Sequence, residues 1–270
     1  MLFNEFHSRI RVEGKITAMK PIHIGTGEDS TNPAQVDAAV LKDSEGRAII
    51  PGSSLKGVLR SRIEGILSSG IDGWRSCNIL SKDSCTQQAA QIKEAFKEKE
   101  KVLKNQKTKV DERDADRKFR RLLQEEYIEC CKEIYENSCD VCRMFGNGKL
   151  AGRVSICDMY TKDKINTERR DGVGINRDSG TAQRGAKYSF EIVPAGTEFD
   201  FLMIAENLDE KQKMLLEIIL QMLKEEDISV GGIISRGLGQ IKLSAITRTE
   251  INRDNIADHY GLGKKEASNV

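Results

Sequence analysis

The N-terminal part of the chain changes from strand-like to helical periodicity. Residues 9–17 alternate polar and apolar side chains, which is the pattern of a half-buried strand. Two short apolar runs within residues 38–50 flank a glycine-containing turn and predict a hairpin. Apolar residues then recur every three or four positions through about Leu67, and Ser53 or Ser54 can cap the helix that this spacing predicts.

Strand-like and helical patterns alternate again in the second half of the chain. Residues 153–160, part of 190–205 and residues 240–243 predict strands, and residues 210–224 carry apolar side chains at helical spacing. Cys157 alternates into the first of these strands, so we expect it in the core. With one helix in each half and no internal repeat, this order predicts an α+β fold built on a split βαβ, or ferredoxin-like, sheet with elaborations.

Two long segments do not fit this sheet. In residues 88–136, 25 of the 49 residues are charged, which predicts a solvated helical insertion that is partly disordered around 104–116. Glycine, arginine and aspartate dominate residues 168–185, which predicts a long exposed loop or hairpin. The expected division is one elaborated domain over 1–270, with a helical insertion over 75–142, the long loop over 165–190 and a polar, fraying tail over 248–270.

Positive charge is concentrated in the middle of the chain. The totals are 43 Lys and Arg against 42 Asp and Glu, which excludes a uniformly basic nucleic-acid binder. Residues 143–187 nevertheless carry 10 basic and 5 acidic side chains, so a polyanion would meet this segment first.

The sequence has no apolar run long enough to span a membrane and no signal-like N-terminus, so we expect a cytoplasmic protein without a membrane partner.

The seven cysteines predict a metal site in a reducing compartment. Cys139 and Cys142 have the two-residue spacing typical of structural zinc, which needs two further ligands. Cys77 and Cys85 flank a short polar loop and are the favoured partners in a four-cysteine zinc site within the insertion. The alternatives are a mixed set that includes Cys130 or Cys131, or no metal at all.

A glycine turn precedes the first predicted helix. In Pro51-Gly52-Ser53-Ser54 the chain enters the helix N-terminus, where unpaired N–H groups and the helix dipole favour an anion such as phosphate. The turn is not a Walker A loop, because the four-residue gap and the second glycine before the lysine are missing, so nucleoside triphosphate binding is disfavoured.

Five segments together resemble a known family. They are HIGTG at 23–27, IIPGSSLKGVLR at 49–60, CDVCRMFG at 139–146, RDGVGINR at 170–177 and GGIISRGLGQIKL at 231–243. This set is similar to the RAMP superfamily of CRISPR-associated proteins, and most similar to the backbone subunit of type III effector complexes, over about Lys15 to Leu243.

The resemblance implies an RRM-like palm with a protruding thumb, here the loop over 165–190. It also implies that copies stack into a filament along CRISPR RNA, and many such subunits cut the paired target RNA once per copy. The implied partners are therefore CRISPR RNA, target RNA, further copies of the chain and other CRISPR effector subunits. Specificity would come from base pairing with the guide rather than from sequence readout by the protein.

The resemblance implies one catalytic aspartate in the loop after the first glycine-rich segment, and the match is Asp37. Cleaving RNA through its own 2′-hydroxyl requires an in-line arrangement, and a carboxylate can position that hydroxyl or a divalent cation such as magnesium. Asp29 and Asp43 are weaker candidates. The alternative for any loop aspartate is a turn-capping role.

Phosphate neutralisation by the basic loop is the expected source of RNA affinity. A lone histidine beside a glycine turn is more typical of a satisfied polar contact than of a general base. The candidate RNA-binding residues are His23, Gly25, Ser53, Ser54, Lys56, Arg60, Arg169, Arg170, Arg177, Arg184 and Arg236.

Two alternative functions remain at this point. A noncatalytic RNA-binding subunit would share the basic loop and the glycine-rich segments but would not cut. An endonuclease that processes precursor guide RNA would need a histidine near those segments, and His7 and His259 lie far from them in the sequence.

Overall fold

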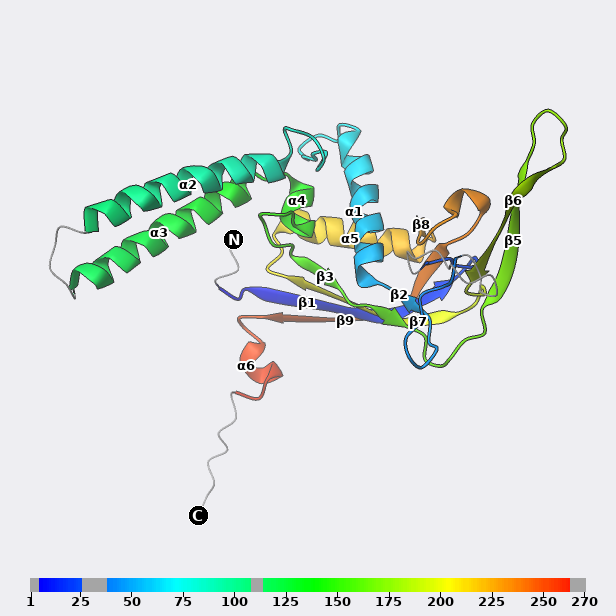
Figure 1. Cartoon of the computed structure of the whole chain (residues 1–270). Coiled ribbons are helices and arrows are strands. Elements are labelled where there is room, and N and C mark those ends of the chain that lie inside the picture. The colour runs from blue at the N-terminus through cyan, green and yellow to red at the C-terminus, as the bar shows by residue number, and fades with distance from the viewer. Residues whose placement is uncertain (1–4, 26–37, 108–113, 263–270) are drawn as a thin grey trace, which may run out of the picture.

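A five-stranded antiparallel sheet is the centre of the protein (Figure 1). The computed structural model describes residues 5–25, 38–107 and 114–262. Helices α1 (Gly52–Ser68) and α5 (Glu210–Lys224) cover one face of the sheet. The strands, in their order across the sheet, are β3 (Val154–Ile156), β7 (Glu198–Glu206), β1 (Ser8–Ala18), β9 (Gln240–Asn252) and β8 (Ile228–Ser229).

The connections make this sheet ferredoxin-like. In chain order, β1, α1 and β3 form one βαβ unit, and β7, α5 and β9 form the second, with their strands interleaved as β3-β7-β1-β9. Because β1 pairs with both β7 and β9, it is the central strand to which both halves attach. The predicted α+β, RRM-like palm is therefore confirmed.

The two faces of β1 explain its period-two pattern. Ile10, Val12 and Ile16 are almost fully buried beneath the helices. Leu55 and Leu59 of α1 reach the same core with no exposed surface. Burying each such side chain contributes roughly 1.5–3 kcal/mol, so the alternation along β1 fixes which face the helices cover.

Several element boundaries differ from those expected. The run 153–160 divides into β3 and β4 (Met159–Tyr160), and β4 pairs with β2 (Ile49–Ile50) instead of continuing in the large sheet. The break exposes Cys157, so its expected core position is wrong.

The last strand is also longer than expected. Residues 248–252 pair with the N-terminal half of β1, and the short helix α6 (Ile256–His259) follows. These residues lie at the sheet surface, where polar side chains are tolerated and hide the strand pattern in the sequence.

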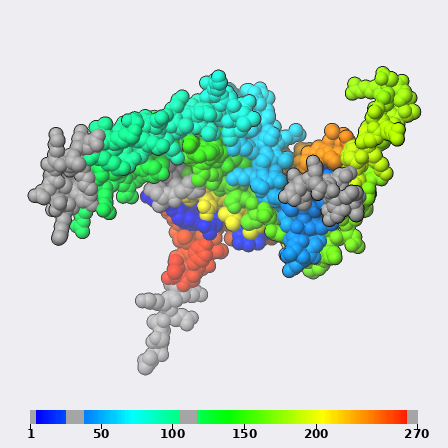
Figure 2. Space-filling model, in the orientation of Figure 1, coloured from blue at the N-terminus to red at the C-terminus, as the bar shows by residue number. Residues whose placement is uncertain are grey.

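The charged insertion is a helical hairpin of α2 (Cys85–Lys107) and α3 (Asp114–Asn137), followed by α4 (Asp140–Phe145). The hairpin projects from the body (Figures 1 and 2). Its small apolar seam includes Ala89, Cys130 and Ile134. Among the described residues, no helix combines the length and apolar character that crossing a membrane requires.

A β-hairpin projects from the opposite end of the molecule (Figure 2). Its strands are β5 (Glu168–Ile175) and β6 (Ala182–Ile192). Most of its side chains are exposed, and its base is anchored by a small apolar cluster that contains Phe190, Ile192 and Leu238. The segment predicted as a long loop or hairpin is thus a regular β-hairpin that stands away from the sheet.

Candidate nucleic-acid interface and metal centre

The two glycine-rich segments meet at one end of the sheet. The Gly232 N–H donates to the His23 carbonyl at 2.8 Å, and the Gly239 N–H donates to the Pro21 carbonyl at 2.9 Å. A Cβ on Gly231 would lie 2.2 Å from the His23 carbonyl oxygen, and the φ of Gly231 is +87°. Only glycine permits this approach, so residues 21–25 and 231–239 form a single surface.

His23 is held as a satisfied polar side chain. The residue is 8% exposed, its Nδ1 lies 2.7 Å from the Glu191 carbonyl oxygen, and its ring packs edge-on against Phe190. Gly25 is exposed beside it and forms a β-bridge with Val40. These contacts favour an organising role for His23 over that of a general base.

Asp37 and Asp29 lie outside the described residues, but the structure places the residue after Asp37. The Ala38 N–H donates to the Ser189 carbonyl, and the Glu191 N–H donates to the Ala38 carbonyl. The segment that contains Asp37 therefore starts from the surface of residues 21–25 and ends against the base of β6.

The carboxylate of Glu191 reinforces this attachment. It accepts the Val40 N–H at 3.1 Å and lies 3.4 Å from the Lys42 Nζ. Partial burial opposes ionisation, but the Val40 N–H and the Lys42 charge prevail and hold the pKa of Glu191 below its usual value.

Asp43 has a structural role. Its carboxylate accepts the N–H groups of Glu45 and Arg47 and pairs with the Arg47 Nε at 2.7 Å. This is the turn-capping arrangement that aspartate side chains favour.

A row of aromatic rings joins the second glycine-rich segment to the β-hairpin. Tyr188 stacks on Phe190 with 6.0 Å between ring centroids, and the Arg236 guanidinium lies 5.5 Å from the centre of the Tyr188 ring. The ring of Tyr188 occupies the space above Gly172, where a Cβ would come within 2.2 Å of it. Arg236 is thereby held, exposed, at the base of the hairpin.

The predicted basic side chains of the hairpin are exposed. Arg169 and Lys187 both pair with Asp171, which neutralises part of the charge near the base. The exposed side chains of the hairpin also include Arg170, Arg177 and Arg184.

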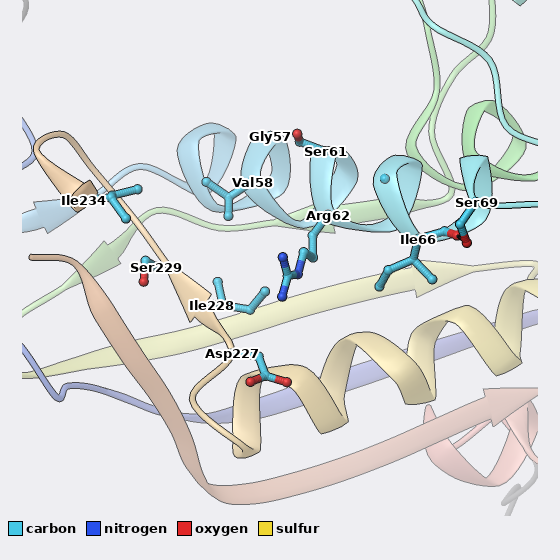
Figure 3. A pocket seen from close by; sticks show the side chains of 11 residues that line it. Gly57, Val58, Ser61, Arg62, Ile66, Ser69, Asp227, Ile228, Ser229 and Ile234 are labelled. Carbon is cyan, nitrogen blue, oxygen red and sulfur yellow. Dashed lines mark hydrogen bonds between the residues drawn. The ribbon is translucent and has the colours of Figure 1, made fainter. Parts of the chain in front are cut away.

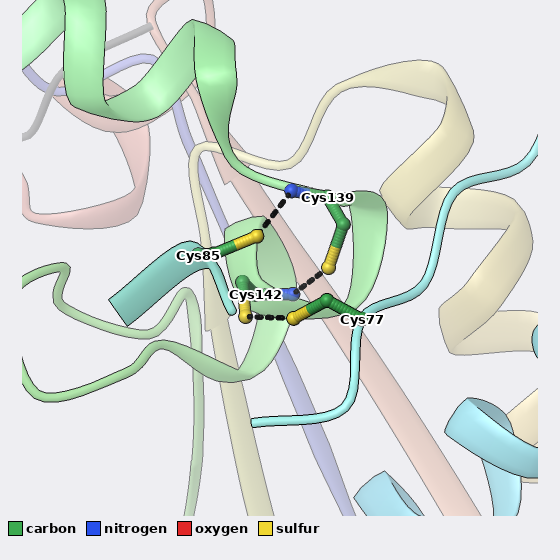
Figure 4. Close-up of side chains that lie close together, drawn as sticks. All are labelled: Cys77, Cys85, Cys139 and Cys142. Carbon is green, nitrogen blue, oxygen red and sulfur yellow. Dashed lines mark hydrogen bonds between the residues drawn. The ribbon is translucent and has the colours of Figure 1, made fainter. Parts of the chain in front are cut away.

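The four favoured cysteines lie together (Figure 4). Cys77 comes from the loop after α1, Cys85 begins α2, and Cys139 and Cys142 lie at the start of α4. Their Sγ atoms lie within 4.8 Å of one another, so the cluster can hold a metal ion. Cys130 and Cys131 lie apart from it on α3.

The sulfur geometry fits tetrahedral zinc. With Zn–S bonds of about 2.3 Å, neighbouring sulfurs lie roughly 3.8 Å apart, and the Cys77 and Cys142 Sγ atoms are 3.7 Å apart. Hydrogen bonds from the Cys139 and Cys142 thiols lower the pKa of Cys85 to about 3, whereas hydrogen bonding with Cys139 and Cys85 raises the pKa of Cys142.

The sequence profile of the RAMP superfamily matches residues 15–242. The chain belongs to the RAMP superfamily. It is 27% identical over 250 residues to the CRISPR system Cms endoribonuclease Csm3 of Methanocaldococcus jannaschii, which covers 88% of this chain and 79% of the relative. A second protein of that name, from Enterococcus italicus, is 43% identical over 56 residues, which cover 20% of this chain and 26% of the relative.

In this RAMP protein, the N-terminus of α1 is arranged differently from what the sequence predicts. Pro51 takes the N-cap position without a side-chain cap, and the Gly52 N–H donates to the Asp158 Oδ1 at 2.8 Å. Ser53 is exposed and Ser54 half-buried on the first turn. The cap of this helix N-terminus therefore comes from the Asp158 carboxylate, which accepts the Gly52 N–H, and not from Ser53 or Ser54 as expected.

Lys56 and Arg60 face inward from α1 toward α4 and the loop after it. The Nζ of Lys56 lies close to Gly152, and burial lowers the pKa of Lys56, with the charge of Arg60 lowering it further. Arg60 donates to Glu64, to the Gly146 carbonyl and to the Cys142 Sγ. Contact of Arg60 with RNA stays a prediction.

A groove of about 940 Å³ runs beside α1 (Figure 3). Gly57, Ser61 and Gly65 line one wall, and this space stays open because the two glycines have no side chain and the serine side chain is small. Arg62 and Asp227 face each other across it (Figure 3). The other wall includes Ile234 of the second glycine-rich segment, so the groove leads to the surface that carries Arg236.

Sequence reasoning missed three residues that build this site. Tyr188 lies in the loop or hairpin predicted over 165–190, and Phe190 lies where that segment meets the strand predicted within 190–205, but neither was singled out as a site residue. Asp158 gave no local signal, because its partner Gly52 lies 106 positions away.

We predict that each chain binds about one zinc ion and that Cys139→Ser removes it. Loss of a ligand that joins α2 to α4 should lower the melting temperature by at least about 5 °C. Metal analysis and thermal unfolding measure the two effects.

The matched control is Cys157→Ser, which removes an exposed thiol outside the cluster. Equal zinc content and stability in the two variants would contradict the metal site.

Proposed function

We propose that this protein is the backbone subunit of a type III CRISPR RNA-guided effector complex, which binds CRISPR RNA and cleaves the paired target RNA. The family and the name of the Methanocaldococcus jannaschii relative, an endoribonuclease of a CRISPR system, support this function. The partners would be CRISPR RNA, target RNA, further copies of the chain and other effector subunits, and the site of action would be the cytoplasm.

The observation that carries the proposal is the meeting of three segments at the hairpin base. The stem of the Asp37 segment, the loop that holds Arg236 and the basic β5–β6 hairpin share the cluster around Phe190. RNA bound along the hairpin and the glycine-rich surface would pass the segment that contains Asp37. The β5–β6 hairpin would then serve as the thumb.

Different groups would supply affinity and chemistry at this surface. Arginine side chains would neutralise phosphates, and the aromatic row would limit how the hairpin moves. Glycines 25 and 232 would let the RNA backbone approach closely. Base pairing with the guide would select the target, so the protein needs no direct readout of base sequence.

Asp37 would act by positioning. The target's own 2′-hydroxyl attacks the adjacent phosphorus, which requires the hydroxyl, phosphorus and leaving oxygen in line. A carboxylate that holds the hydroxyl in this arrangement contributes mainly in the transition state. A divalent cation such as magnesium, when bound, would neutralise charge that develops on the phosphate.

We also propose that the cysteine cluster holds structural zinc. Zinc would join the loop after α1, the start of α2 and the start of α4, and so fix the root of the helical hairpin against the palm. The four thiolates would leave no open position for substrate, so this metal would take no part in cleavage.

Processing of precursor guide RNA is disfavoured by the positions of the histidines. His7 and His259 lie beside the N-terminal end of β1 and the C-terminal end of β9, whereas the glycine-rich surface lies past the other end of β1. An 11-residue strand separates the two ends by roughly 35 Å. Among the described residues, His23 is the histidine that lies at the glycine-rich surface. Its Nδ1 is already in hydrogen-bond contact with the Glu191 carbonyl oxygen.

We expect that changing Arg170, Arg177 and Arg184 together to Glu weakens guide RNA binding by at least about tenfold. Losing three phosphate contacts on a single strand should also flatten the slope of log affinity against log salt by about 2. Filter binding at several salt concentrations measures both effects.

The matched control reverses Arg117, Arg120 and Arg121, three exposed arginines of α3. Equal loss of affinity in the two triple variants would show a general charge effect and reject the hairpin as the RNA contact.

We expect that Asp37→Ala slows target cleavage by about 10²-fold or more while guide and target affinity change less than about twofold, because the carboxylate acts in the transition state. Cleavage and binding are measured on the same preparation, with Asp29→Ala as the control from the same segment.

Two results would contradict this role. Retained cleavage in Asp37→Ala would mean that another aspartate of this chain, such as Asp29 or Asp43, serves the cleavage, or that this chain is a noncatalytic RNA-binding subunit and the activity comes from elsewhere in the complex. Loss of both cleavage and binding would assign Asp37 to holding its segment in place.

A further inference from the structure

Arg60 contacts the cysteine cluster from the middle of α1. Its side chain is 16% exposed, and each of its three nitrogens has a protein acceptor. One terminal nitrogen lies 3.4 Å from the Cys142 Sγ, the other donates to the Gly146 carbonyl at 2.6 Å, and Nε pairs with Glu64 at 2.7 Å. The guanidinium therefore bridges α1 to the first turn and to the C-cap of α4.

A metal-loaded cluster would need such a contact. Four thiolates around one divalent zinc carry a net charge of −2, and Cys85, Cys139 and Cys142 are each at most 6% exposed. Buried negative charge is costly unless hydrogen bonds or opposite charge compensate it. The N–H groups of Cys139 and Cys142 donate to cluster sulfurs and supply part of this compensation.

The neighbouring cations bind other acceptors around the cluster. Arg75 donates to the carbonyls of Glu136 and Ser138, Arg143 donates to the carbonyls of Tyr135 and Glu136, and Lys211 approaches Asp140. Among the described residues, Arg60 is the cation with a hydrogen bond to a cluster sulfur. Arg60 thus contacts a sulfur of the cluster, whereas the surrounding basic side chains contact oxygen acceptors near it.

We propose that Arg60 is a positioning residue of the metal site, which donates to the Cys142 thiolate and locks α1 onto α4, rather than an RNA contact. This inference rests on the proposed zinc site. It links the metal to the interface, because α1 begins at the glycine turn and lines the groove that leads toward Arg236. Outer partners of metal ligands typically change metal affinity by about 10- to 100-fold when they are removed.

The test compares Arg60→Gln, Arg60→Lys and the control Arg62→Gln in the full chain. Arg62 lies two residues further along α1 but faces the groove (Figure 3). Zinc affinity is measured by chelator competition, the thiolate-to-metal absorption band is recorded with cobalt(II) in place of zinc, and guide RNA affinity is measured on zinc-saturated protein.

We expect Arg60→Gln to bind zinc at least about tenfold more weakly and to shift the cobalt band, while Arg60→Lys recovers part of both and Arg62→Gln matches the wild type. RNA affinity of zinc-saturated Arg60→Gln should stay within about twofold of the wild type.

Wild-type zinc affinity and an unshifted cobalt band in Arg60→Gln would overturn the inference. If the RNA affinity of the zinc-saturated variant falls at the same time, Arg60 is an RNA contact instead. If Arg60→Gln does not fold, Arg60→Lys decides, because lysine keeps the charge but loses the fork geometry that reaches Cys142 and Gly146 together. Weaker zinc binding and a shifted cobalt band in Arg60→Lys would support the inference, and wild-type values of both would overturn it.

Failure of the underlying metal site gives a different pattern. In that case the wild type and Arg62→Gln also bind no zinc and give no thiolate-to-cobalt band.

Discussion

The backbone contact between the His23 carbonyl and Gly231–Gly232 is the constraint on which the interface depends. It brings together two segments more than 200 residues apart, and Gly231 leaves no room for a side chain. The chain from Ile24 onward leads to the Asp37 segment, and the chain after Gly232 leads to Arg236. The single backbone contact between them therefore sets where the Asp37 segment and the Arg236 loop begin. The aromatic row of β6 then joins the basic hairpin to the same place.

Helix α1 connects the glycine-rich surface to the cysteine cluster. Its first turn packs so closely on residues 156–158 that a Cβ on Gly52 would lie 2.0 Å from the Ile156 carbonyl oxygen. Further along, Arg60 reaches the cysteine cluster that gathers the roots of α2 and α4. Different faces of this one helix thus contribute to the groove, the core and the cysteine cluster. Gly57, Ser61 and Gly65 lie on the groove side, and Leu55, Leu59 and Leu67 lie on the buried side.

The sequence predicted those features whose signals are local. Periodicity located α1, α5 and the buried face of β1, and cysteine spacing selected the four residues that cluster. It could not show that Asp158 supplies the acceptor for Gly52, or that Arg60 turns toward Cys142, because those pairings depend on contacts across 82 or more positions. The end of β9 could not be predicted as a strand either, because its residues are mostly polar. They are held in place by pairing with β1, which leaves no apolar pattern in the sequence.

We propose that guide RNA follows the surface formed by the glycine-rich segments and the β5–β6 hairpin. Ultraviolet crosslinking of guide RNA that carries 4-thiouridine, followed by mass spectrometry of the crosslinked peptides, tests it most directly. We expect crosslinks in residues 168–192 and 231–239. Crosslinks confined to the α2–α3 hairpin, with none in those two segments, would contradict it.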